Sequence, residues 1–419
     1  TRFTNLELFD WMAREASSAY YHAFRQALTM ARRAEACFRH ERSEADTRTF
    51  IGSAQWDDLR QGLLAGTRLH RELRNMEEAY LDENKRDLEI TKHVSLNQLD
   101  AHALMTLRAT GACEFTRPEW LFDLDFPTHY RRRIKSVAVT IPAVVGPYAS
   151  VNATLSLTKA TWRKKAKPAA FAGYTEADAD LVTTPLAPPP SIVTSSGQND
   201  SGMFETILRD ERYLPFEGAG VDSVWKLELP HATNLLDRDS ITDVILHIRY
   251  TATAAPLATA DVDNVLERAL DKANAAPPTR LFSIRHDFAT AWAAFTAAPA
   301  GVASYTLELD FSRFIPPSRT TTARGLMSLE LWFVDVRHPF RCSIGTHPTS
   351  ETETIMPKKL SDPPGKYEVG QYIQFTEAIS VDGDQIVLAL SPASGPAFSD
   401  AQLAAIRAGH AFAVATFDD

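Results

Sequence analysis

The residue types that most often carry catalysis or bind metals are scattered along this chain without the spacing that such chemistry needs. The 419 residues include twelve histidines and three cysteines. The sequence contains no HExxH pair, no CxxC pair and no Cys/His zinc pattern. It also lacks the GxSxG, GxxxxGK[ST] and GxGxxG motifs of hydrolases and nucleotide-binding proteins. We therefore expect no enzyme, no catalytic metal and no cofactor.

Three short patterns could still be taken for binding sites. The stretch Gly218 to Gly220 is rich in glycine, but a phosphate-binding loop needs a helix after it and none is predicted there. His286-Asp287 stands at a predicted helix start, where helix capping explains it better than catalysis. Asn199-Asp200 with Asp382 and Asp384 could suggest calcium, but the turn preferences of Asn and Asp account for all of them.

The composition predicts a globular protein with more than one core. With 419 residues, 44% of them hydrophobic and 10% aromatic, the chain is expected to form two or three domains. A net charge of -9 argues against a nucleic-acid partner, because surfaces that bind nucleic acids are usually basic. The basic cluster from Arg131 to Lys135 is expected to be a solvated or ion-paired strand edge. The three cysteines are far apart and do not indicate a disulfide scaffold.

No segment of the sequence is predicted to cross a membrane. The apolar runs have the length of strands, well below the ~20 residues that span a bilayer. No signal peptide is visible, and the sequence starts at Thr1 rather than at a methionine. We expect a segment of a larger protein that has been cleaved or trimmed.

Residues 1–96 are predicted to form an antiparallel pair of long helices, over Thr4 to His40 and Ser53 to Val94. Small and apolar residues recur in the first helix with a period of about 3.5, which is typical of a coiled coil. The predicted seam consists of Phe9, Met12, Ala16, Ala19, Ala23, Ala27, Met30, Ala34 and Cys37, opposite Leu59, Leu63, Gly66, Leu69, Leu73, Met76 and Tyr80. Tyr20 and Phe24 flank this seam and would offer a second face to neighbouring chains.

Residues 97–255 are predicted to form an antiparallel β-sandwich. The run RRRIKSVAVTIPAVVGPYASVNATLSL, from Arg131 to Leu157, alternates apolar and polar residues over two strands. Pro142 and Gly146-Pro147 separate these strands, and six or seven strands of this kind indicate a sandwich. The predicted core consists of Val137, Val139, Ile141, Leu155, Leu157, Val244, Leu246 and Ile248.

Residues 256–419 are expected to form an additional β-rich domain with short helices. Tyr305 to Phe311 and Met327 to Phe333 alternate as strands do, and Ser399 is placed to cap a helix over Asp400 to Ala408. The predicted fold class is therefore α+β. It comprises a long antiparallel helical hairpin, an antiparallel β-sandwich and a second β-rich domain with short helices.

Four blocks of sequence, in order, resemble one known family. They are Phe3 to Glu41, Trp56 to Leu96, Arg132 to Leu157 and Gly197 to Ala252, the last with the wording GQNDSGMFE, RYLPFEGAG and DVILHIRYTA. Their order, spacing and wording resemble the TcB-binding region at the C-terminus of the A component of Tc (toxin complex) insecticidal toxins.

The resemblance implies a non-enzymatic assembly and docking domain in a secreted or released toxin complex. Members of the family are large homopentamers in which an α-helical shell encloses a translocation channel. Their β-rich end caps the channel and forms a platform for the β-propeller of the B component, whose gate opens on docking and admits the toxic cargo. The receptor-binding, shell and pore-forming parts are missing from this sequence, and residues 256–419 extend past the end of shorter members.

Partner contacts are expected on loops at one end of the sandwich, because loops on a rigid scaffold commonly carry binding. The candidates are Asn199 and Asp200 in the GQNDSG loop, and Phe216 and Glu217 in the LPFEGAG loop. Phe216 is either an apolar anchor for the partner or simply a core residue. The sequence leaves open an alternative function, a free-standing β-sandwich module that binds carbohydrate or a surface receptor.

Overall fold

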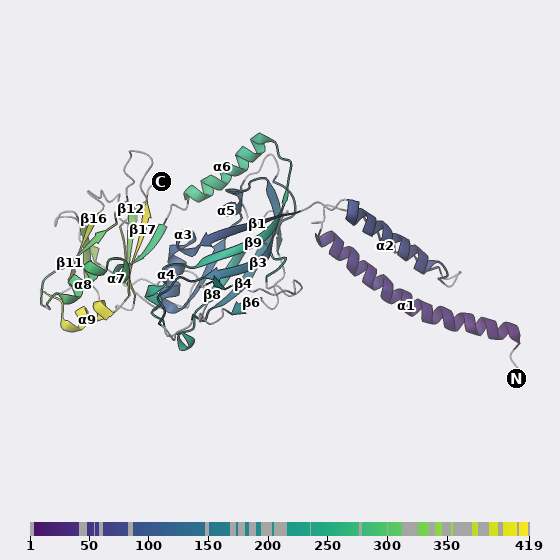
Figure 1. The fold of residues 1–419 in the computed structure, drawn as a ribbon, viewed down its shortest axis with the longest axis horizontal. Helices are drawn as coiled ribbons and strands as arrows, with labels where there is room; N and C mark the ends of the chain where they lie inside the picture. The colour runs from purple at the N-terminus through teal and green to yellow at the C-terminus, as the bar shows by residue number, and fades with distance from the viewer. Residues whose placement is uncertain are drawn as a thin grey trace.

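In the computed structural model the chain forms three consecutive parts (Figure 1). A helical arm projects from a central β-sandwich, and a second β-rich part follows on the opposite side, near the C-terminus. The structure describes residues 4–41, 48–53, 55–57, 62–82, 87–146, 151–167, 173–174, 181–183, 190–193, 203–204, 216–234, 236–275, 279–299, 301–311, 326–334, 340–345, 353–354, 371–375, 385–392, 397–408 and 410–417. The predicted α+β class with antiparallel sheets is confirmed.

The helical arm consists of α1 (Asn5–Glu41) and α2 (Ala65–Asp82), which run in the same direction. The start of α2 lies beside the middle of α1, where Gly66 N donates to Tyr20 Oη at 2.8 Å. The end of α2 lies beside the end of α1, where Tyr80 Oη donates to Glu41 Oε1 at 3.0 Å. The predicted antiparallel arrangement of the two helices is therefore wrong.

An extended segment between the helices makes the parallel arrangement possible. Phe50 N donates to Glu35 Oε1 at 2.6 Å, and the Trp56 ring lies 5.6 Å from that of Phe24, so the segment returns along α1. An extended residue covers about 3.3 Å and a helical residue about 1.5 Å, so a few extended residues match several turns of α1. The second helix consequently begins at Ala65 rather than at Ser53.

The contact between the helices uses a different face of α1 from the predicted seam. The arm buries Phe24, Ala31, Ile51, Ala65 and Leu69, and partly buries Leu28, Trp56 and Leu73. Three large members of the predicted seam are exposed: Phe9 by 67%, Met12 by 51% and Met30 by 70%. The alanine-rich stripe is therefore an apolar outer surface of α1.

Leu69→Ala is expected to lower the free energy of unfolding of the arm by about 2–5 kcal/mol, because a buried leucine loses apolar burial and leaves a cavity. Leu69 is 4% exposed, whereas Leu63, just before α2, is 75% exposed. Leu63→Ala, the matched control, should change stability by no more than about 0.5 kcal/mol. Urea unfolding followed by far-ultraviolet circular dichroism measures both, and equal effects would contradict this packing.

Two antiparallel sheets form the central sandwich, one with strand order β1-β9-β3-β7 and one with order β2-β8-β4-β5, in which β6 also pairs with β4. The first sheet contains β1 (Leu88–Ser95), β9 (Ile245–Ala254), β3 (His129–Thr140) and β7 (Met203–Phe204). The second contains β2 (Ala112–Arg117), β8 (Asp222–Glu228), β4 (Thr154–Arg163), β5 (Leu181–Thr183) and β6 (Ser191–Val193).

The predicted core of the sandwich is confirmed. One buried cluster contains all of its eight residues, which are Val137, Val139, Ile141, Leu155, Leu157, Val244, Leu246 and Ile248. Trp225 and Tyr250, both 0% exposed, enlarge the same cluster. Ala138, on the opposite face of β3, is buried as well, so part of that face is also covered.

β1 contradicts the predicted continuation of the second helix to Val94. This segment pairs with β9 along its whole length and adds an edge strand to the first sheet. Ile90, Thr91 and Val94 are β-branched, and β-branched residues pack well on a pleated surface. The charged helical pattern ends with α2 at Asp82.

Short helices cover the ends of the central sandwich. They are α3 (Leu96–Leu99), α4 (Ala101–Thr110), α5 (Trp120–Asp123) and the longer α6 (Thr259–Ala275), which packs against α5. Asp100 caps α4 by accepting a hydrogen bond from Ala103 N at 2.9 Å, and Gly111 ends it with φ of 84°. None of the helices in the described part of the chain is both long and apolar enough to span a bilayer.

The third part contains two further antiparallel sheets, with orders β10-β17-β12-β15 and β11-β16-β13-β14. The strands are β10 (Thr279–Ser283), β11 (Tyr305–Asp310), β12 (Leu326–Val334), β13 (Phe340–Gly345), β14 (Glu353–Thr354), β15 (Gln371–Phe375), β16 (Gln385–Pro392) and β17 (His410–Phe417). The helices are α7 (Ile284–Asp287), α8 (Ala289–Ala297) and α9 (Asp400–Ala408). Ser399 caps α9 as predicted, accepting from Gln402 N at 3.3 Å.

The third part packs against the central sandwich through one of its sheets. Leu281, Trp332, Phe412 and Val414 belong to the same buried cluster as the core of the central sandwich. The strands that carry them, β10, β12 and β17, contribute other residues to a separate buried cluster within the third part. This sheet therefore has apolar contacts on both faces, and α4 lies against β10 and β17.

Candidate docking surface

The loop before β8 carries two of the four predicted partner-binding residues. Asn199 and Asp200 lie outside the described residues. Glu217 is exposed, whereas Phe216 is 4% exposed and packs edge-on against Trp225 with ring centroids 4.9 Å apart. Phe216 is thus a core residue here, and Glu217 is the accessible candidate of this loop. That Glu217 contacts a partner stays a prediction.

The backbone of this loop is strained where it meets β3. Phe216 has φ of 68° and Arg131 has φ of 51°, both in the left-handed region. This conformation costs a residue with a side chain roughly 1–2 kcal/mol, and it persists only where the surroundings fix the backbone. Arg131 lies at an irregularity of β3 between Tyr130 and Arg133. Such strain is concentrated at functional sites, which makes this loop a candidate for binding.

Backbone contacts fix the loop to β3 and β4. Gly218 N donates to Ile134 O at 2.9 Å, and Ile134 N donates to Ala219 O at 2.7 Å. Gly220 lies so close to β4 that a Cβ atom there would be 1.8 Å from Thr161 O. Only glycine fits at this position, so Gly220 is required by the close packing of the loop backbone against β4.

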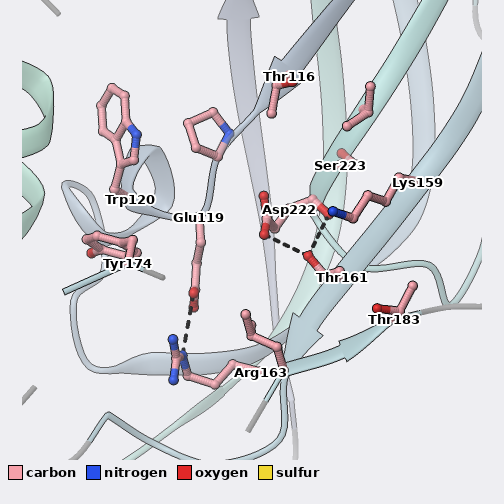
Figure 2. Close-up of a pocket in the computed structure, with 13 residues that line it drawn as sticks. Thr116, Glu119, Trp120, Lys159, Thr161, Arg163, Tyr174, Thr183, Asp222 and Ser223 are labelled. Carbon is pink, nitrogen blue, oxygen red and sulfur yellow. Dashed lines mark hydrogen bonds and ion pairs between the residues drawn. The ribbon is translucent and has the colours of Figure 1, made fainter. Parts of the chain in front are cut away.

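Directly after the loop, β8 contributes to a polar pocket of about 340 Å³ (Figure 2). The pocket is lined by Thr116, Pro118, Glu119, Trp120, Lys159, Thr161, Arg163, Tyr174, Leu181, Thr183, Asp222, Ser223 and Val224. Asp222 accepts from Thr161 Oγ1 at 2.7 Å, and burial raises the pKa of its carboxyl. Arg163 Nε donates to Glu119 Oε2 at 3.4 Å. The pocket can therefore offer charged groups of both signs, together with hydroxyls, to a polar side chain of a partner.

A buried network of charged side chains lies behind the pocket. Asp123, which is 0% exposed, accepts from Arg132 Nη2 and from Lys167 Nζ, each at 2.8 Å, and from the hydroxyl of Tyr174. Lys167 also donates to Glu119 Oε1 at 3.2 Å. Because buried charges need partners, this network fixes α5 to β3 and to the end of β4.

Burial and neighbouring charges act in opposite directions on the acids and bases of this network. Burial alone would raise the pKa of the Glu119 carboxyl, but Lys167 and Arg163 hold it below its usual value. Burial would likewise lower the pKa of the Arg132 guanidinium, but Asp123 and Glu119 raise it. Both groups therefore stay ionised at neutral pH.

The basic cluster on β3 is ion-paired, as predicted. Arg131 Nη2 lies 2.9 Å from Asp87 Oδ1, and Lys135 Nζ lies 2.9 Å from Glu89 Oε2. Arg132 differs from its neighbours, because it is 2% exposed and belongs to the buried network. The cluster does not lie at an open strand edge, because β9 pairs with one side of β3 there and the loop before β8 pairs with the other, where Gly220 bridges to Arg133.

A rigid sandwich that presents a fixed loop beside a polar pocket, with an attached helical arm, is suited to a protein–protein docking domain. The model of one family, described as Tc toxin complex TcA C-terminal TcB-binding domain, matches residues 1–252. The chain belongs to this family. The match ends within β9, so the third part lies beyond it.

The chain is also similar to individual proteins of Yersinia and Morganella, over about the same share of its length. Toxin subunit YenA2 of Yersinia entomophaga is 39% identical over 260 residues, which cover 60% of this chain and 19% of that protein. The cryo-EM structure of Yersinia pseudotuberculosis TcaA-TcaB is 29% identical with a TM-score of 0.43, over 61% of this chain and 14% of the other. That of Morganella morganii TcdA4 is 27% identical with a TM-score of 0.39, over 60% and 11%. The match therefore spans 19% of the length of the curated relative.

Proposed function

We propose that this chain is the docking part of a Tc-toxin-like A subunit, which binds the β-propeller of a B component and gates the entry of toxic cargo into a translocation channel. The match of residues 1–252 to the TcB-binding family carries the proposal. Exposed Glu217, on a fixed loop beside the polar pocket, supports a docking surface at this end of the sandwich. We expect no catalytic activity. The family match gives no support to the alternative of a carbohydrate- or receptor-binding module.

We further propose that the A subunit assembles as a homopentamer in a secreted or released toxin complex. The exposed apolar stripe of α1, with Phe9, Met12 and Met30, supports contacts with other helices, because extended apolar surfaces mark protein interfaces. We also propose the division of the chain at 96/97 and 255/256. The mass of the assembled full-length subunit tests the oligomeric state, and a monomer would contradict it.

Replacing Asn199, Asp200 and Glu217 together, by Ala, Asn and Gln, is expected to weaken binding of the B component on the order of tenfold. When one side of a polar contact at an interface is removed, the group on the partner stays buried without a hydrogen bond, and this weakens binding. Biolayer interferometry with the cognate B component measures the change, and the mass of the A assembly should stay the same.

The control variant also removes two negative charges, but from a part of the chain outside the loop. Asp10 and Glu15 are exposed on α1, in the helical arm and not in the loop, and Asp10→Asn with Glu15→Gln should leave the affinity within about twofold. If the loop variant binds as the parent does, the docking surface lies elsewhere, and residues after Ala260 become the next candidates. Equal losses in both variants would indicate a general effect of charge.

A further inference from the structure

Acidic residues of the central sandwich meet a histidine of the third part where these two parts pack together. Asp237 and Asp239 belong to the turn around the short helix η4 (Arg238–Ser240), and His286 belongs to α7. One ligand-type atom from each of the three side chains lies within 4.8 Å of the other two. The three residues are thus brought together by tertiary packing and not by any sequence motif.

The distance between Asp237 and His286 suits two ligands of one cation. His286 Nε2 lies 3.6 Å from Asp237 Oδ2, which is too long for a hydrogen bond. Ligand atoms about 2.1 Å from a tetrahedral zinc ion are separated by about 3.4 Å. The other carboxylate oxygen of Asp237 accepts from Asp239 N at 3.1 Å and so fixes the side chain.

Asp239 supplies a buried oxygen atom that lacks a hydrogen-bond donor. Asp239 is 3% exposed, and among the described residues no donor reaches its Oδ1 atom. Its other oxygen, Oδ2, accepts from His410 Nδ1 at 2.6 Å. Carboxylates that bind metals are usually held in place by a hydrogen bond of this kind. An unpaired buried carboxylate oxygen is costly, and a cation would satisfy it.

The surrounding charges leave the cluster negative. Arg108, on α4, interacts electrostatically with Asp239, Asp243 and Asp287. Within the described residues it forms no ion pair with Asp239, and its Nη2 donates to Thr242 O at 3.2 Å instead. Arg108 is therefore shared among three carboxylates and is not a dedicated ion partner of Asp239.

We propose that Asp237, Asp239 and His286 bind a divalent cation of the zinc class, with water completing the coordination, and that this cation links the central sandwich to the third part. The histidine nitrogen favours zinc over calcium or magnesium, which prefer sites made of oxygen atoms alone. Because the ligands come from both parts, bound metal should stabilise their packing. This inference does not depend on the proposed docking function.

Isothermal titration of the metal-free full chain with zinc chloride tests the proposal. We expect one site per chain with micromolar or tighter affinity, and a melting temperature that zinc raises and a chelator lowers again. His286→Gln and Asp237→Asn alter exposed side chains, so the fold should tolerate them. Each should weaken zinc binding on the order of tenfold or more. Cobalt should give the visible spectrum of a tetrahedral site, and His286→Gln should abolish it.

Two control variants at other histidines test whether zinc binds at His286. His231→Gln alters an exposed histidine of the same sandwich outside the cluster, and it should leave zinc binding unchanged. His93 and His247 form a histidine pair outside the cluster, with 2.5 Å between their Nδ1 atoms. Zinc binding that is lost in His93→Gln and retained in His286→Gln would overturn the assignment. So would a chain that binds no zinc, or one that binds calcium alone.

Discussion

Gly220→Ala is expected to prevent folding of the central sandwich or to lower its free energy of unfolding by at least about 3 kcal/mol. The added Cβ would lie 1.8 Å from Thr161 O and 2.2 Å from Thr161 C, both of them backbone atoms that cannot rotate away. Gly220 also pairs with Arg133 on β3, and Val221 N donates to Arg132 O at 3.3 Å, so the loop is held from the other side. Overpacking typically costs 1–3 kcal/mol where side chains can adjust, and here backbone must move.

Gly218→Ala is the matched control two residues earlier in the same loop. Gly218 has φ of 77°, but no heavy atom lies within 4 Å of the position of an added Cβ. Alanine there should cost only the strain of the left-handed backbone, about 1–2 kcal/mol. Urea unfolding followed by the fluorescence of the buried tryptophans measures both variants. If Gly218→Ala were as damaging as Gly220→Ala, the close approach to β4 would not be the cause.

The sandwich core could be predicted because alternation along a strand is a local property. Val137, Val139 and Ile141 alternate with more polar residues, and one buried face is enough to set that pattern. β1 was missed for a related reason, since its residues lie on an edge strand and alternate weakly in burial. Its β-branched Ile90 and Val94 were the available signal, but the charged residues before them favoured a longer helix.

The helical arm shows where periodicity stops being informative. A stripe of period 3.5 indicates that a helix has an apolar face, but it does not say which element covers that face. In α1 the buried face contains Phe24 and Phe38, while the alanine stripe stays exposed. The direction of α2 depends on the connection before it, where the apolar residues Ile51 and Trp56 pack along α1 instead of forming a solvated turn.

The polar clusters could not be predicted, because their members are distant in sequence. Asp123 and Lys167 become ion partners only after α5 packs beside the end of β4, and His286 approaches Asp237 only after the third part docks. Of the predicted docking residues, the structure places Glu217 at the surface and Phe216 in the core. A φ value of 68° at Phe216 cannot be read from residue types, since phenylalanine rarely adopts it.

Asp123→Ala is expected to lower the free energy of unfolding of the central sandwich by about 3–5 kcal/mol, because it leaves buried cations without their anion. Arg132 and Lys167 both donate to Asp123 Oδ1 at 2.8 Å, and Asp123 is 0% exposed. After the substitution Glu119 would be the remaining anion of the network, although three cations face it. Its separation of 3.5 Å from Arg132 Nη1 and 3.2 Å from Lys167 Nζ is longer, so it compensates only in part.

Asp125→Ala, two residues later, is the control for Asp123→Ala, and the pH dependence of stability is a second test of the network. Asp125 pairs with Lys92, but its side chain is 44% exposed, so its loss should cost no more than about 1 kcal/mol. The pKa of the Glu119 carboxyl is lowered in the folded protein, so the stability that its ionisation contributes is present above the unfolded value of about 4.3. That contribution is lost as the pH falls through the lower folded value. Denaturant titrations of the parent at a series of pH values measure its free energy of unfolding. The part contributed by ionised Glu119 should be constant from neutral pH to about 5 and should disappear only in stronger acid. An Asp123→Ala variant that loses no more stability than Asp125→Ala would show that the buried charges do not stabilise the sandwich.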